Sequence, residues 1–120
     1  MKLRILSPLF VAAVIAVVFC FQPSRAQSSP RRIEIVAKRF NFTPSEITLK
    51  KGEPVVIAFT SQDVNHGLKV KELGLSIKAN KGQAGEFPFT PNQAGTFVGQ
   101  CSVFCGSGHG QMKMTFHVTE

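Results

Sequence analysis

The stretch 101–112 brings together four side chains that can bind a metal: Cys101, Cys105, His109 and Met112. Thiolate and thioether sulfurs are soft donors that suit cuprous copper, while imidazole binds either oxidation state of copper. The mixture therefore favours a redox-active copper over a hard cation such as calcium or magnesium. We interpret this stretch as a copper-binding loop.

The same loop contains three glycines, Gly106, Gly108 and Gly110. A loop that folds four donors onto one point needs backbone conformations that residues with a Cβ rarely adopt, and glycines supply them. A further donor must come from elsewhere in the chain, and His66 is the candidate. It follows an apolar run and lies in a polar turn before Gly67, so its ring could project toward the loop from the end of a β-sandwich. A single loop histidine is usually an ordinary surface residue, but the neighbouring cysteines and second histidine favour a ligand.

Two other uses of the cysteines compete with copper. Cys101 and Cys105 could form a disulfide, but so short a ring removes little entropy from the unfolded chain and leaves His109 and Met112 unexplained. Zinc could use both cysteines and two histidines, but Cys-x3-Cys-x3-His is not a usual zinc-finger spacing and Met112 would have no role.

The residues around these donors have simpler roles. Met112 shares the sequence parity of Met114, Phe116 and Val118, so it could also be a core residue. We assign Met114 to the core and expect His117 to point outward, with neither acting as a ligand.

From residue 31 onward the chain shows short runs of alternating apolar and polar residues separated by turn residues, which predicts an all-β sandwich or barrel with little helix. Residues 55–59 are almost wholly apolar and suit a central strand. We expect hairpin turns at 51–54 and 91–95, each containing glycine and proline, and a long connection across one end of the sandwich at 71–86.

The N-terminal segment has the features of an export signal. Lys2 and Arg4 precede an apolar run at 5–21, and small residues at 24 and 26 suit a signal peptidase. We therefore expect residues 1–26 to be a signal peptide, residues 27–30 a short tether and residues 31–120 one domain, exported and periplasmic. The alternative is an uncleaved anchor at 5–21, although this run is shorter than the roughly 20 residues that span a bilayer.

The charge of the chain is +7, and removal of the N-terminal segment leaves eleven basic and seven acidic residues, a net charge of +4. The basic residues are scattered, so the sequence does not predict a nucleic-acid partner. A solvated surface explains them, and an acidic docking partner is the sharper alternative.

Three segments resemble the copper-binding domain of cytochrome c oxidase subunit II, a cupredoxin with a binuclear CuA centre: D-V-N-H at 63–66, G-T-F at 95–97 and C-S-V-F-C-G-S-G-H-G-Q-M at 101–112. The resemblance covers most of residues 31–120 and implies a Greek-key β-sandwich of the cupredoxin type. It also implies two copper ions bridged by Cys101 and Cys105, with His66 and His109 as one imidazole for each ion. Met112 would be a weak ligand of one ion, and the backbone carbonyl of Val103 a weak ligand of the other.

The chain also departs from that family. Subunit II usually has glutamate at the position of Val103, where the side chain helps to bind a second metal at the interface with the catalytic subunit, and it normally carries a transmembrane hairpin. The chain has neither feature, and it contains no Trp or Tyr. We expect a free-standing relative rather than a full oxidase subunit.

The resemblance implies a one-electron carrier between redox partners, such as a cytochrome and a terminal oxidase or reductase, and not an enzyme acting alone. Three alternatives stay open: a periplasmic copper-handling protein that delivers the metal to another protein, a mononuclear blue-copper carrier that uses one of the cysteines, and a subunit of a split oxidase bound to a membrane partner.

Overall fold

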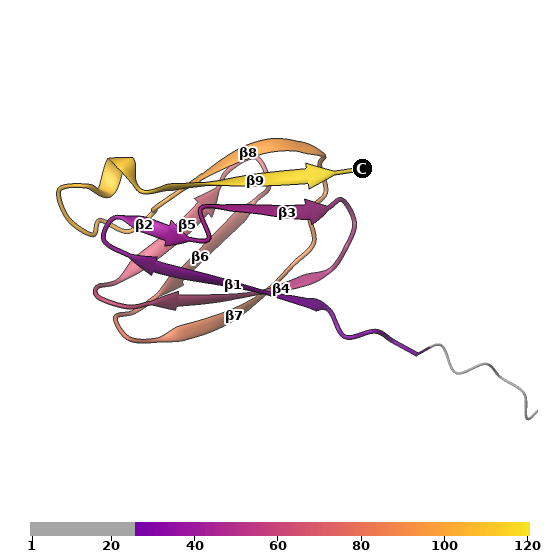
Figure 1. The fold of residues 1–120 in the computed structure, drawn as a ribbon, viewed down its shortest axis with the longest axis horizontal. Helices are drawn as coiled ribbons and strands as arrows, with labels where there is room; N and C mark the ends of the chain where they lie inside the picture. Colours follow the sequence, from indigo (N-terminus) through magenta and orange to yellow (C-terminus); the bar gives the residue numbers. More distant parts are fainter. Residues whose placement is uncertain (1–25) are drawn as a thin grey trace, which may run out of the picture.

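The computed structural model describes residues 26–120, which form two β-sheets packed face to face (Figure 1). One sheet has the strand order β2-β1-β4-β7 and the other the order β3-β9-β8-β5-β6. The prediction of an all-β sandwich is confirmed, and the single helical element within residues 26–120 is a short 3-10 turn. In chain order the elements are β1 Arg31–Lys38, β2 Asn41–Thr43, β3 Glu46–Lys50, β4 Val55–Ser61, β5 His66–Val70, β6 Leu75–Ala79, β7 Ala84–Phe89, β8 Gly95–Gln100, η1 His109–Gln111 and β9 Lys113–Thr119.

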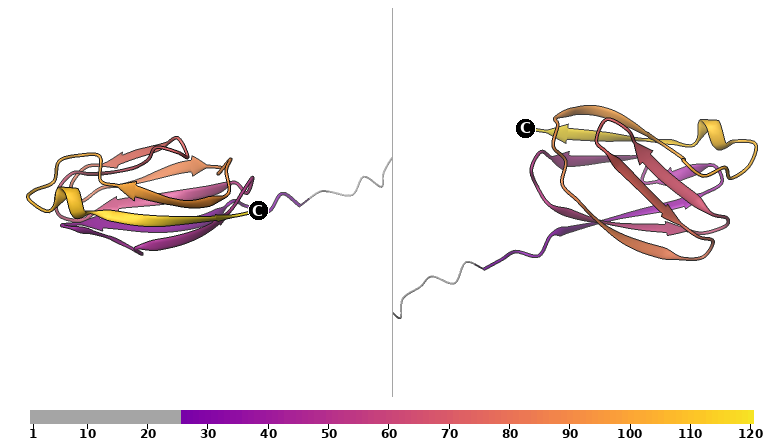
Figure 2. Two further views of the ribbon diagram at one scale, coloured as in Figure 1. Left: turned by 90° about the horizontal axis from the view of Figure 1, so that it is seen from above. Right: turned by 180° about the vertical axis from the view of Figure 1, so that it is seen from behind.

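The two sheets mix parallel and antiparallel pairing. Strand β1 pairs in parallel with β4, and β3 pairs in parallel with β9, whereas the other pairs are antiparallel. The two layers are seen edge-on in the left view of Figure 2. Strands that are parallel neighbours cannot be joined by a tight turn and need a crossover connection. Here the chain makes these crossovers by passing repeatedly from one sheet to the other.

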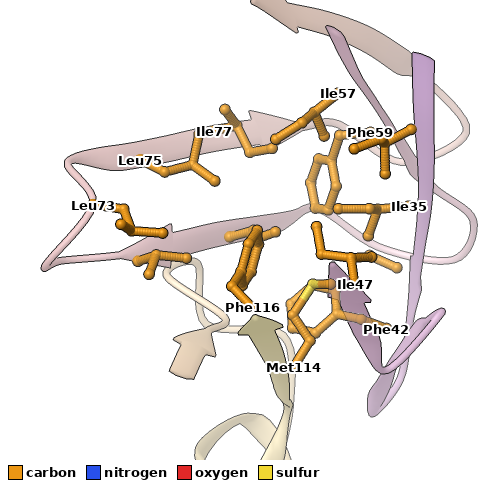
Figure 3. Packing of buried hydrophobic residues seen from close by; sticks show 14 of the residues in the cluster. Ile35, Phe42, Ile47, Ile57, Phe59, Leu73, Leu75, Ile77, Met114 and Phe116 are labelled. Carbon is orange, nitrogen blue, oxygen red and sulfur yellow. The ribbon is translucent and has the colours of Figure 1, made fainter. Parts of the chain in front are cut away.

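Alternation along each strand builds the core between the sheets. In β1, Ile33, Ile35 and Ala37 are buried while Glu34 between them is exposed, as a strand with one covered face requires. The apolar run of β4 lies between β1 and β7 and is almost entirely buried, as predicted for a central strand. Figure 3 shows Ile35, Phe59 and Phe116 meeting between the layers.

The last strand bears out the expected division between core and surface. Met114 is 2% exposed and belongs to the same core cluster as Phe42 (Figure 3). His117 is partly exposed and points outward, with its Nε2 3.3 Å from Oε2 of Glu46. Neither residue lies among the predicted metal donors.

Two turn predictions were right about chain reversal but wrong about hairpins. Residues 51–54 connect β3 to β4 and residues 91–95 lead from β7 into β8, and each connection joins strands of different sheets. Gly52 and Gly95 do take the positive φ values expected of turn glycines, 78° and 141°. Turn residues show that the chain changes direction, but not which strand it pairs with next.

The expectation of a long connection across one end of the sandwich at 71–86 is wrong. This segment contains β6, which forms a hairpin with β5 through the turn at residues 71–74 and lies at the edge of its sheet. Leu75, Ile77 and Ala79 alternate inward and are buried. The alternation of apolar and polar residues was not recognised in the sequence because lysines, glycines and an asparagine surround these three apolar positions.

Three connections gather at the end of the sandwich that lies away from the C-terminus: the β1–β2 turn, the β4–β5 loop and the long loop between β8 and β9 (Figures 1 and 2). The predicted signal peptide at 1–26 and the alternative anchor at 5–21 lie outside the described residues, apart from Ala26. Among the described residues, none of the helical structure is long and apolar enough to cross a membrane.

Candidate metal centre

The predicted sulfur and nitrogen donors come together at this end of the sandwich. Cys101 follows β8, Cys105 lies in the loop between β8 and β9, and their Sγ atoms are 3.8 Å apart. Nδ1 of His66 lies 3.8 Å from Sγ of Cys101, and Nδ1 of His109 lies 3.8 Å from Sγ of Cys105. The contacts thus run in the order His66, Cys101, Cys105, His109, which we call the donor row, and the first three of these donors form a compact group within 4.8 Å of one another.

Two weaker donors lie beside the cysteines. The backbone carbonyl of Val103 is 3.1 Å from Sγ of Cys101. Sδ of Met112 is 3.8 Å from Sγ of Cys105. Each cysteine therefore has one imidazole and one weaker donor of its own beside it.

His66 occupies the buried part of the row. It is the first residue of β5 and is 0% exposed, so its ring is held by the strand that carries it. Nε2, the ring nitrogen that faces away from Cys101, lies 2.8 Å from Oδ1 of Asp63. A carboxylate on the second ring nitrogen is the usual way in which proteins fix the orientation of a metal-binding histidine and strengthen it as a ligand.

Asp63 connects this histidine to a distant turn. Its carboxylate also accepts hydrogen bonds from the backbone amides of Arg39 and Val64, both at 2.8 Å. Burial by itself would raise the pKa of Asp63, but these two amides and the His66 ring lower it to about 2. The carboxylate is therefore ionised across the whole physiological range.

Arg39 also reaches the loop between β8 and β9, residues 101–112, which we call the cysteine loop. Its Nε donates a hydrogen bond of 2.7 Å to the carbonyl oxygen of Cys105. The β1–β2 turn thus holds the β4–β5 loop through its backbone amide and the cysteine loop through its side chain. Residues more than sixty positions apart in the sequence become one connected network around the donors.

Phe40 shapes the cysteine loop by occupying space. The glycines were predicted to be needed for their backbone freedom, and this holds for Gly106, whose φ is 138°. Gly108 has an ordinary negative φ, but a Cβ there would lie 2.5 Å from the Phe40 ring. A Cβ on Gly110 would meet nothing within 4 Å, so the expectation that all three glycines are conformationally required is wrong for two of them.

The thiols are free and buried. Cys101 is 6% exposed and Cys105 is 4% exposed, and no disulfide joins them. Burial, together with the adjacent Cys101 thiol, raises the pKa of Cys105 to about 11, although the Arg39 guanidinium opposes the shift. Metal binding at this thiol therefore releases a proton at neutral pH.

The donor set fits copper. Two free sulfurs, two imidazole nitrogens and a thioether are soft or intermediate ligands, and the donor atoms of His66, Cys101 and Cys105 all lie within 4.8 Å of one another. Met112 is 0% exposed, so it belongs to the core, as its parity suggested, and to the donor cluster at the same time.

Sequence reasoning missed the residues that support the donors. Asp63 stands three residues before His66, and this short spacing was the one available signal. Arg39 and Phe40 gave none, because their proximity to residues 105–108 arises only when β1 packs into the sandwich. Phe104, which is 79% exposed and lies with its ring centroid 5.7 Å from that of His109, was also overlooked.

Comparison with known proteins agrees with this architecture. A curated relative, cytochrome c oxidase subunit 2 of Thermus thermophilus, is 28% identical over 96 residues, which are 78% of this chain and 71% of the relative. The crystal structure of the periplasmic domain of cytochrome oxidase subunit II from Bradyrhizobium japonicum superposes with a TM-score of 0.68 at 22% identity, covering 78% of this chain and 86% of that one.

A blue copper protein has the same fold. Auracyanin A from Chloroflexus aurantiacus matches with a TM-score of 0.59 at 22% identity, over 76% of this chain and 100% of that protein. The family described as the cupredoxin-like domain matches residues 10–115, most of the chain. The two-sheet sandwich with its donors at one end is therefore that of a cupredoxin, and the chain belongs to the cupredoxin-like domain family.

Proposed function

We propose that this protein is an exported one-electron carrier with a binuclear copper centre of the CuA type. The observation that carries the proposal is the paired arrangement of the donors. Two sulfurs lie side by side, and each has its own imidazole and its own weaker donor. A mononuclear blue-copper site needs one cysteine, so it would leave the second buried thiol and one of the two flanking donors unused.

Each residue has a role in this proposal. Cys101 and Cys105 would hold the two ions through their thiolates, and His66 and His109 would each supply an imidazole ligand. The Val103 carbonyl and Met112 are the weak ligands. A bound pair of copper ions would supply a redox couple in which one electron is shared between two metals.

The protein around the donors keeps the centre rigid and dry. Both cysteines, His66 and Met112 are buried, and the Asp63–Arg39 network holds the two loops in place before any metal arrives. Little rearrangement of the ligands on electron transfer would make the transfer fast.

The relatives of the chain support a proposal for its partners and its location. The curated relative is a subunit of cytochrome c oxidase, and one of the solved structures is a periplasmic domain of such a subunit. We therefore propose a periplasmic protein that exchanges electrons with a cytochrome or a terminal oxidase or reductase, with residues 1–26 as its export signal and residues 31–120 as its domain. It would act as a carrier and not as an enzyme by itself.

Copper titration with electron paramagnetic resonance tests the proposal. The chain at 27–120, which comprises the tether and the domain, should bind two copper ions and show one unpaired electron delocalised equally over both. Cys101→Ser and Cys105→Ser should each abolish this signal. One copper per chain, or a one-centre spectrum that survives one of the two substitutions, would instead establish a mononuclear site.

The same preparation distinguishes a carrier of electrons from a carrier of copper. Because both cysteines, His66 and Met112 are buried, the loaded protein should lose copper slowly to a strong chelator. Rapid loss, or transfer of the metal to another copper protein on mixing, would favour the copper-handling alternative.

A further inference from the structure

Two shallow depressions flank the cysteine loop on the surface of the protein. One is lined by Val103, Phe104, Cys105 and Gly106 together with Arg39, Val64, Asn65 and Lys81. The other is lined by Cys101 and Ser102 together with Lys69, Lys71, Glu72, Val98 and Gln100. We call the surface formed by residues 101–106 and these two depressions the loop face.

The loop face carries the exposed apolar side chains. Among the described residues, the large hydrophobic side chains that stand exposed are Phe104, at 79%, and Val98, at 48%, and each lines one of the two depressions. The Phe104 ring also packs against the ring of His109, which is the less buried of the two histidine donors. An apolar group this exposed, directly over a predicted ligand, suits the centre of an intermolecular contact.

The cations of the loop face lack acidic partners. Arg39 and Lys81 line one depression and Lys69 and Lys71 the other, and none of the four forms an ion pair within residues 26–120. In contrast, Arg31, Arg32 and Lys51 do pair with glutamates.

Two carboxylates lie near these four cations. Glu72 lines the second depression, and Asp63 is occupied by His66 and by the amides of the neighbouring loops. The loop face is therefore net positive and has apolar side chains among its charges.

We propose that the loop face is the docking surface for an acidic redox protein, whose carboxylates lie against the four cations while an apolar patch covers Phe104. This inference rests on the proposed function and specifies the partner by its chemistry. In the transfer step one electron leaves the reduced copper centre and reduces the oxidised metal cofactor of the partner. No proton moves, and no covalent bond forms or breaks. Opposite charges on the two surfaces raise the association rate, and the apolar contact brings the His109 ring close to the partner.

Paired probes of opposite charge test the proposal. Basic mitochondrial cytochrome c in its ferric form, and the same cytochrome with its lysines succinylated to reverse its charge, are each mixed with the reduced copper-loaded protein in a stopped-flow instrument. The succinylated form should react faster at low salt, with a rate that falls as ionic strength rises, and the native form should show the opposite salt dependence.

Two charge-reversal variants, one on the loop face and one away from it, show whether the electrostatic effect on the reaction rate comes from the loop face. Lys81→Glu on the loop face should slow the reaction with succinylated cytochrome at low salt about 3- to 10-fold, the scale of electrostatic steering. Lys50→Glu, at the exposed end of β3, changes the net charge by the same amount and should change the rate less than about twofold. Phe104→Ser should slow the reaction while leaving its dependence on salt unchanged.

Equal effects of Lys81→Glu and Lys50→Glu, or faster reaction with the native basic cytochrome, would overturn the proposal. A second measurement separates this result from failure of the copper centre itself. Titration of the isotope-labelled, metal-free protein with succinylated cytochrome should shift backbone amide resonances around Phe104 and Lys81, whatever the copper content. Absence of shifts there, or shifts centred on Lys50, would also overturn it.

Discussion

The two ends of the donor row are held in different ways. His66 is fully buried at the start of a strand, and a carboxylate fixes its second nitrogen. His109 is partly exposed, begins a single 3-10 turn inside a loop and contacts an exposed phenylalanine. The first end belongs to the β scaffold and the second to the surface.

This difference gives the two ends of the site different roles. The scaffold end can keep its donors in place without metal, because the strand and the Asp63–Arg39 network hold them. The surface end lies where a partner can approach. One end of the donor row is rigid and shielded from water, and the other end is accessible. This arrangement suits a metal centre whose ligand geometry must stay the same while electrons enter and leave.

Removal of either histidine should have the largest effect, and its rescue by imidazole should distinguish the two ends of the donor row most clearly. His66→Gly and His109→Gly should each abolish the two-copper spectrum. Added imidazole should restore a similar spectrum in His109→Gly, because that ring is reached from solvent, and should fail in His66→Gly, whose ring is enclosed. Electron paramagnetic resonance with and without imidazole gives the answer, and equal rescue of both variants would show that the two ends do not differ in access.

Loss of the carboxylate should weaken the scaffold end alone. Asp63→Asn retains the shape of the side chain but removes the charge beside His66, and such losses typically cost about 10- to 100-fold in metal affinity. Competition with a copper chelator measures the affinity. Glu72→Gln removes a carboxylate that makes no hydrogen bond to a donor residue, and it should leave the affinity within about twofold. Equal losses in both variants would mean that Asp63 acts only through overall charge.

Substitution of the loop glycines should give the smallest effects and should rank them. Gly108→Ala forces a Cβ against the Phe40 ring and should cost about 1–3 kcal/mol in the free energy of unfolding, as overpacking does. Gly106→Ala strains a positive φ and should cost about 1 kcal/mol or more. Gly110→Ala meets open space and should stay within about 0.5 kcal/mol. Chemical denaturation of the metal-free domain measures all three, and a large loss in Gly110→Ala would contradict the assigned cause.

The strands could be predicted from the sequence wherever one face of the strand is buried and the other is exposed to solvent. The alternation of Ile33, Ile35 and Ala37, or of Met114, Phe116 and Val118, predicts both a strand and its inward face, and the structure confirms them. Strand β6 was missed because its apolar residues stand among lysines near glycine and asparagine. The turns at 51–54 and 91–95 were assigned to hairpins because turn residues record a reversal of the chain and not the sheet that follows it.

By itself, the sequence determined the chemistry of the candidate site: the sulfur and nitrogen donors, their soft character and the loop that carries most of them. Those properties are local, because they depend on residue type and on spacing within twelve positions. Tertiary structure decided everything that depends on distant segments meeting. His66 comes beside Cys101, and Asp63 and Arg39 connect the two loops. Phe40 fills the space that Gly108 leaves, and Phe104 stands exposed at a depression that Arg39 and Lys81 also line. These contacts join positions up to about seventy residues apart, and they form only when β5 pairs with β8 in one sheet and the two sheets pack on each other.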